Sequence, residues 1–238
     1  MGNSTVNRKV EDMFRQADSE LQRPGRQLSM HPFILGVEKG TLNKSHLKAW
    51  AEQVFLHVSP PVKWLGVTYA NCDDDEIRKI VFNVLVEEAT GQISGTKAHP
   101  ELIADFAEAV GSVRANLKTN APLPATEALV NLWEILLCHR HWAVAMGGMG
   151  FGGERQIPAT FRKATEGLAK HYGISDKNRQ FFDVHIGADE DHGDEAIEIV
   201  MRANPTDAML DDIHRSIIMT AESMWNCWMA FEAADAAR

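Results

Sequence analysis

FFDVHIGADEDHGDEA, residues 181–196, combines two histidines and several acidic residues with the apolar spacing of a helix. Helix positions four and seven residues apart differ by about 40° and 20° around the axis. His185, Asp189 and His192 therefore lie on one ridge of one face. One interpretation is half of a metal site, and the other is a solvated helix face. The segment alone does not separate the two, so further ligands have to come from elsewhere in the chain.

Helical spacing of apolar residues continues along nearly the whole chain, and no segment has the alternation of a strand. Proline, glycine and polar capping residues mark the boundaries of the segments. We predict helices over residues 4–23, 31–40, 43–69 with a kink at Pro60-Pro61, 73–88, 99–111, 126–146, 158–171, 175–203 and 205–236. The expected product is one all-α domain, residues 1–238, a bundle of seven or eight main helices around one core.

The composition excludes several classes of function. The chain has 238 residues, 45% of them hydrophobic, and no apolar run approaches the roughly 20 residues needed to cross a bilayer. Its start lacks an apolar signal-peptide core, so we expect a cytoplasmic protein without a membrane partner. The formal charge of −9, without clusters of Lys and Arg, argues against nucleic acid as a partner. Its three cysteines are widely spaced, which fits neither a disulfide framework nor a Cys-based zinc site.

The glycine-rich stretch GGMGFGG, residues 147–153, has the appearance of a phosphate-binding loop. No strand precedes it and no GK[ST] follows, and both are needed for that motif. A loosened helix or close helix packing around small residues is the favoured interpretation.

Further candidate ligands lie outside the histidine-rich segment. Glu88 follows Val81, Val84 and Leu85 at helical spacing, which predicts that it faces inward, with Glu87 the less inward of the two. A buried carboxylate is costly unless it is paired or bound to a metal. His99 follows after a short stretch, and Glu154 follows the uncharged run 142–153. Imidazoles and carboxylates without thiolates favour iron or manganese over structural zinc. Six such ligands suit a dinuclear centre.

These residues, in this order, resemble the haem-oxygenase-like diiron oxidases, relatives of pyrroloquinoline-quinone synthase and of the thiaminase II family. The resemblance rests on short pieces spread over most of the chain: HPF at 31, LKAWAEQ at 47, EEATG at 87, HPELIADFAEAVG at 99, GGERQIP at 152 and FFDVHIGADEDH ending at 192. It implies the metal ligands Glu88 (or Glu87), His99, Glu154, His185, Asp189 and His192. It also implies two Fe(II) ions, with Mn/Fe as an alternative, O2 as cosubstrate, and catalytic roles for Glu88, Glu154 and His192.

The resemblance leaves the reaction open among N-oxygenation, desaturation and oxidative C–C cleavage. We expect a small-molecule substrate, amino-acid-like in kind, with an external electron donor and a homodimer as further options. The alternatives are a cofactorless oxidase of the quinone-synthase type and a non-catalytic helical binding protein. Thiaminase II enzymes use a cysteine, for which Cys138 is a candidate by residue type only. One subfamily consumes its own tyrosine to make an aminobenzoate, and the presence of only Tyr69 and Tyr172 makes that route less favoured.

Several residues are candidates for the substrate pocket. Trp64 and Trp142 are expected to line it, whereas Trp133 and Trp228 fit ordinary helix packing. His57 is either a substrate contact or, as is more common, a hydrogen-bonded core histidine. Lys63 and Arg155 are candidates for holding a substrate carboxylate, with solvated charges the more common role.

Overall fold

The computed structural model describes the backbone of residues 2–236 and the side chains of residues 5–187 and 195–234. Within those ranges every regular element is helical, which confirms the all-α prediction. The helices are α1 (Gly2–Leu21), α2 (Pro32–Lys39), α3 (Lys44–Val58), α4 (Pro61–Asn71), α5 (Asp75–Thr90), α6 (His99–Ala109), α7 (Pro124–His139), α8 (Trp142–Met146), α9 (Ile157–Tyr172), α10 (Asp176–Arg202), α11 (Asp207–Trp228) and α12 (Ala233–Ala236). None of the helices in the described part of the chain has the length and apolarity to cross a membrane.

Three predicted helices are each divided in two. The segment 205–236 ends as α11 at Trp228 and resumes as α12 at Ala233, after a short 3₁₀ turn over Met229–Glu232. The segment 43–69 was expected to kink at Pro60-Pro61, but α3 ends at Val58 and α4 begins at Pro61. Proline lacks an N–H and suits the first turn of a helix, so the pair starts a new helix. The segment 126–146 is likewise divided, because His141 caps α8 by accepting a hydrogen bond from the N–H of Ala143 at Nδ1.

The glycine-rich stretch is a buried, widened helical turn. Residues 147–151 form a π-helical turn that continues α8. A Cβ on Gly152 would lie 2.4 Å from the carbonyl oxygen of Ile217, and one on Gly148 would lie 2.6 Å from Ser216 Oγ. Only glycine permits this close approach to α11. Close packing around small residues is therefore confirmed, and the phosphate-loop alternative is wrong for this buried segment.

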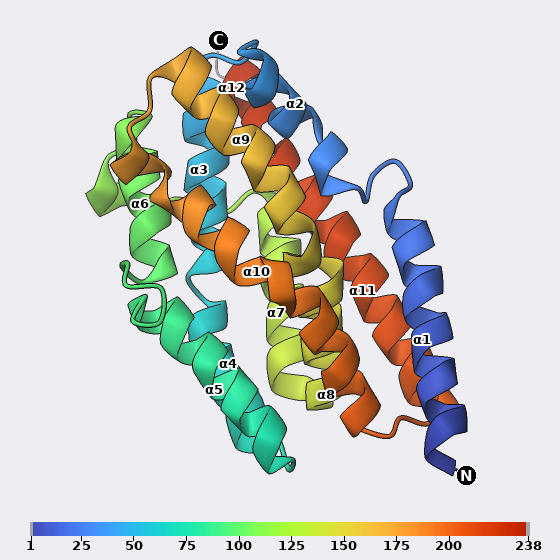
Figure 1. Cartoon of the computed structure of the whole chain (residues 1–238). Helices are drawn as coiled ribbons and strands as arrows, with labels where there is room; N and C mark the ends of the chain where they lie inside the picture. The colour runs from blue at the N-terminus through green and yellow to red at the C-terminus, as the bar shows by residue number, and fades with distance from the viewer. Residues whose placement is uncertain (1, 237–238) are drawn as a thin grey trace.

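Helix α10 crosses the molecule diagonally, between the α4–α5 pair on one side and α1 and α11 on the other (Figure 1). It packs against α9, α6 and the π-helical turn. An aromatic cluster fixes its position: Phe182 stacks on Trp50 of α3 with ring centroids 5.8 Å apart, and Trp50 stacks in turn on Phe33. Because Phe182 is fully buried, the helical turn that follows it, with His185, is held against the core.

His31 is a buried histidine whose structural role depends on its neutral form. Its Nδ1 accepts a hydrogen bond from the N–H of Phe33, which caps α2, and its Nε2 donates one to the carbonyl of Trp225. Burial lowers the pKa of His31 to about 4. Protonation of Nδ1 would remove the cap, so this imidazole is stable in the fold only while it is neutral.

We predict that His31→Asn reduces the acid sensitivity of folding. The unfolded chain takes up a proton near the ordinary histidine pKa while folded His31 does not, so its contribution is present above that value and lost as pH falls towards about 4. Asparagine keeps the capping acceptor without the titration. The free energy of unfolding, measured with urea, should fall between about pH 7 and about pH 4.5 by about 2 kcal/mol less in His31→Asn than in the unchanged chain.

The exposed His139→Asn is the matched control and should behave as the unchanged chain does. An equal loss of stability on acidification in the unchanged chain and in both variants would show that protonation of His31 does not cause the acid sensitivity.

Candidate metal centre

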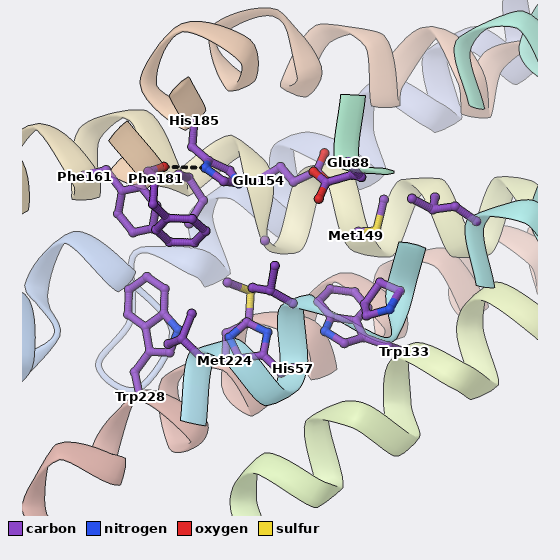
Figure 2. Close-up of a pocket in the computed structure, with 16 residues that line it drawn as sticks. His57, Glu88, Trp133, Met149, Glu154, Phe161, Phe181, His185, Met224 and Trp228 are labelled. Atoms are coloured by element: carbon purple, nitrogen blue, oxygen red, sulfur yellow. Dashed lines mark hydrogen bonds between the residues drawn. The ribbon is translucent and has the colours of Figure 1, made fainter. Parts of the chain in front are cut away.

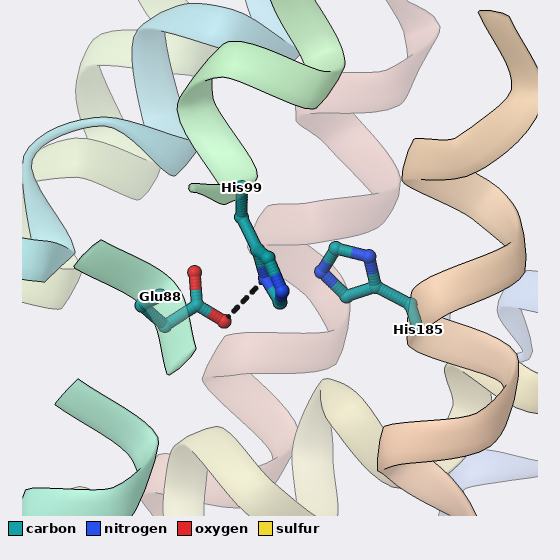
Figure 3. A group of neighbouring side chains, drawn as sticks. All are labelled: Glu88, His99 and His185. Atoms are coloured by element: carbon teal, nitrogen blue, oxygen red, sulfur yellow. Dashed lines mark ion pairs between the residues drawn. The ribbon is translucent and has the colours of Figure 1, made fainter. Parts of the chain in front are cut away.

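Two imidazoles and one carboxylate from three helices converge on one point. Glu88 lies near the end of α5, His99 is the first residue of α6, and His185 is in the middle of α10. One ligand atom from each lies within 4.8 Å of the other two. Figure 3 shows His99 between the other two side chains. Two histidines with one carboxylate are the ligand set of many non-haem Fe(II) oxygenases, and it leaves coordination positions open.

Glu87 holds one ring nitrogen of His99, and the other ring nitrogen faces Glu88. The His99 side chain is 2% exposed, and its Nε2 donates to the carboxylate of Glu87 over 3.3 Å. Its Nδ1 lies 2.8 Å from Glu88 Oε1, yet the alignment is not that of a hydrogen bond, and this buried nitrogen has no hydrogen-bond partner. A cation bound by Nδ1 and the Glu88 carboxylate together would satisfy both. The arrangement is the carboxylate–histidine–metal relay seen around many bound metals.

Glu87 is more buried than the helical spacing predicts. It is 9% exposed whereas Glu88 is half-buried, so the expectation that Glu87 is the less inward residue is wrong. The reason is the loop after α5, whose Ile93 and Ser94 N–H groups both donate to Glu87 Oε2 at 3.0 Å. Gly91 makes this loop possible: it has φ +64°, and a Cβ there would lie 2.3 Å from the Lys97 carbonyl oxygen.

The two carboxylates and His99 form a strongly coupled group. Burial pushes the pKa of Glu87 upward, but hydrogen bonds from Ser94 and His99 outweigh it and leave that pKa below its usual value. Burial has the opposite effect on His99 and lowers its pKa, but the carboxylates of Glu88 and Glu87 outweigh burial and leave that pKa raised. The site therefore attracts positive charge, which is either a proton or a metal ion.

His185 is oriented by its own helix. Its Nδ1 donates to the carbonyl of Phe181, one turn earlier, over 2.6 Å. That hydrogen bond assigns metal binding to Nε2. The imidazole ring lies against that of His99, with centroids 4.3 Å apart.

The remaining predicted ligands are Glu154, Asp189 and His192. Glu154 begins the short turn after the π-helical segment and lines the same cavity as Glu88 and His185. The run 142–153 before it is buried throughout. Asp189 and His192 lie within α10, but their side chains are outside the described residues.

Glu195 is a carboxylate that was not among the predicted ligands. It is half-buried and lines one polar hollow with Glu88 and His99 and a second hollow with Glu154. Its position three residues after His192 places it on a neighbouring part of the same helix face, and this spacing could have identified it as a candidate from the sequence.

A mainly apolar cavity of about 110 Å³ lies next to the site (Figure 2). Its walls include Trp133, Trp228, Phe161 and Phe181. Two expectations about tryptophan are therefore wrong: Trp133 and Trp228 line this cavity, whereas Trp64 and Trp142 do not. The indole N–H of Trp142 instead donates to Asp73, which directs that ring away. Helical spacing places a ring on a face, but the neighbouring helices decide whether that face meets a cavity.

The candidate cations and the candidate thiol lie away from this cavity. Lys63 is exposed, and Arg155 lies over the ring of Phe151 and 3.4 Å from a carboxylate oxygen of Asp18. Both have the surface role that was the more common expectation. Cys138 is half-buried, does not line the cavity, and has its thiol pKa raised by burial and by Glu134. An activated thiolate is therefore not supported.

Curated relatives share the length of the chain. A 4-aminobenzoate synthase from Nitrosomonas europaea is 28% identical over 221 residues, which cover 89% of this chain and 87% of that protein. A protein of the same name from Chlamydia pneumoniae is 28% identical over 205 residues, covering 84% and 87% of the two chains.

Solved structures share the fold. A TenA homologue from Pseudomonas syringae superposes with a TM-score of 0.77 at 12% identity, covering 95% of this chain and 92% of the other. A domain with a haem-oxygenase-like fold from Shewanella denitrificans has a TM-score of 0.69 at 16% identity, covering 99% and 95%. The sequence model of a family described as iron-containing redox enzymes matches residues 48–225, which hold Glu88, His99 and His185. The chain belongs to this family of iron-containing redox enzymes.

Proposed function

We propose that the protein is a non-haem dinuclear iron oxidase that uses O2 to oxidise a small metabolite. The observation that carries the proposal is the convergence of Glu88, His99 and His185, in which the buried Nδ1 of His99 lies 2.8 Å from a carboxylate oxygen of Glu88. While Nε2 donates to Glu87, this nitrogen and the carboxylate face each other as two acceptors, which requires a proton or a metal ion between them. Oxygen and nitrogen ligands without thiolate suit iron.

The residues that would hold iron fall into two groups. Glu88, His99 and His185 supply one group, and Glu154, Asp189 and His192 are proposed to complete the second. Ferrous iron bound there would supply the activation of O2, which amino-acid side chains alone do not perform. Glu87 keeps His99 in the orientation that directs Nδ1 to the metal, and the apolar wall keeps bulk water from the reacting centre.

The finer parts of the proposal concern substrate and partners. N-oxygenation, desaturation and oxidative C–C cleavage all remain candidates, and Mn/Fe remains an alternative to Fe/Fe. An external electron donor and a homodimer stay predictions. An amino-acid-like substrate also stays a prediction, although neither Lys63 nor Arg155 lines the cavity to hold its carboxylate. A cofactorless oxidase is less favoured, because it would leave the inward-facing ligand set without a role.

Formation of 4-aminobenzoate is a second candidate, favoured by the names of the relatives. A route that consumes a tyrosine of the chain needs that ring close to the iron. The chain has only Tyr69 and Tyr172. Tyr69 is 40% exposed and packs on Phe82, while the Tyr172 hydroxyl accepts a hydrogen bond from the N–H of Leu42. Neither lines the cavity, so we propose that any aromatic substrate comes from outside the chain.

Anaerobic titration with Fe(II) followed by O2 tests the main proposal. We expect about two irons per chain and a transient visible absorption band after mixing with O2. Glu154→Ala and His192→Ala should each lose the band and at least one iron, since each removes a proposed ligand. The exposed Glu166→Gln is the control and should retain both signals. Stoichiometry of one iron or fewer in the unchanged chain, or full retention in both ligand variants, would refute a dinuclear site.

The role of Glu87 is tested by Glu87→Gln. The amide is a weaker acceptor for the His99 N–H and can reverse its orientation, so iron affinity should fall by about 10-fold to 100-fold. Competition with a chromogenic chelator measures the affinity. Glu76→Gln, on the exposed side of the same helix, should bind iron as the unchanged chain does. Loss of all bound iron in Glu87→Gln would instead make Glu87 a direct ligand.

The origin of an aromatic product is tested with Tyr69→Phe and Tyr172→Phe. Both variants should keep the O2-dependent absorption band and the intact mass of the chain after reaction, because neither ring lies at the cavity. Intact-mass spectrometry before and after O2 addition makes the measurement. Loss of a tyrosine side-chain mass on reaction, absent in one of the two variants, would establish the self-consuming route.

A further inference from the structure

His57 is a buried polar side chain with an unused hydrogen-bonding atom. It lies near the end of α3, is 7% exposed, and lines the apolar cavity. Its Nε2 is buried and has no hydrogen-bond partner. Burial lowers the pKa of His57 to about 4, so the ring is neutral near pH 7. Its Nε2 can then donate or accept one hydrogen bond, according to the tautomer. The indole Nε1 of Trp228, in the wall of the same cavity, is also buried without a partner, so the wall contains two polar atoms whose hydrogen bonds the protein leaves unmade.

In the metal-free chain, the rest of the cavity wall selects against anionic ligands. Four aromatic rings and the thioethers of Met149 and Met224 form much of it, and such groups pack well on a flat apolar body. The ionisable groups in the described wall, besides His57, are Glu88, Glu154 and His185. No lysine or arginine among the described residues lines it, so a ligand carboxylate would meet negative charge without a compensating cation.

The volume of the cavity matches a ligand with about one aromatic ring. Its volume is about 110 Å³. An engineered apolar cavity of about 150 Å³ in another protein takes up benzene. A compact molecule with a single ring therefore matches the space, with minor adjustment of the flexible Met149 and Met224 side chains.

We propose that this cavity is the substrate site and takes a small neutral aromatic molecule bearing one hydroxyl or amino group, which hydrogen-bonds to His57 Nε2. The reaction that follows rests on the proposed iron oxidase function, but the binding does not. In Figure 2 His57 lies across the cavity from Glu88, Glu154 and His185. A ligand anchored at His57 therefore presents its opposite edge to the metal-binding side chains, and that edge is where oxidation is directed.

The test uses phenol, toluene and benzoate as probes of the same ring size. Calorimetric titration is made on the metal-free chain and repeated on the Fe(II)-loaded chain under argon. In the metal-free chain we expect phenol to bind more tightly than toluene, because it satisfies His57, and benzoate to bind at least about 10-fold more weakly than phenol.

Two variants assign the preference to His57. His57→Leu should reduce the ratio of toluene to phenol dissociation constants by about 10-fold, since it removes the hydrogen-bonding atom. His57→Gln should retain part of that ratio. His139→Leu, an exposed histidine away from the cavity, is the control and should leave the ratio unchanged. Circular dichroism establishes that each variant is folded.

The outcomes separate this inference from the proposed function. Equal binding of phenol and toluene, tightest binding of benzoate, or an unchanged ratio in folded His57→Leu would each overturn the inference while leaving the iron titration unaffected. Phenol binding that depends on His57 in a chain that takes up no iron would support the site and refute the oxidase. If neither His57 variant folds, the order of the three probes in the unchanged chain decides.

Discussion

The contact between His99 and two glutamates is the constraint on which the rest of the site depends. Glu87 binds one ring nitrogen, and the other faces Glu88 without a hydrogen bond. This arrangement needs the loop after α5 to fold over Glu87, which in turn needs Gly91 in a left-handed conformation. It also needs α10 pinned to the aromatic core through Phe182, since His185 follows one turn later. The geometry of the site around His99 therefore depends both on the backbone of the loop after α5 and on the packing of α10.

Much of the fold was predictable because apolar spacing, prolines and glycines specify helices locally. The convergence of Glu88, His99 and His185 was also predictable, since their residue types and order are those of a metal site. What sequence spacing could not predict depends on contacts between segments. A helical wheel places Glu87 outside because it omits the loop that covers it. It cannot distinguish Trp133 at the cavity from Trp142, whose N–H is bound to Asp73.

The metal-binding side chains and the cavity together define a division of roles. In the proposed arrangement the polar side would hold a metal ion, and the apolar side would hold a small ligand that bonds to the unpartnered Nε2 of His57. The relatives named 4-aminobenzoate synthase share the chain length and the family. In this chain both tyrosines lie away from the cavity, so a shared iron chemistry is compatible with a different source of substrate.

The most direct test of the account is an anomalous difference map at the iron edge from crystals of the Fe(II)-loaded protein grown without O2. The account predicts an iron peak bonded to the Glu88 carboxylate, to Nδ1 of His99 and to Nε2 of His185, with Glu87 hydrogen-bonded to His99 rather than to the metal. An iron bound by Glu87 in place of Glu88, or no peak between these side chains, would contradict it.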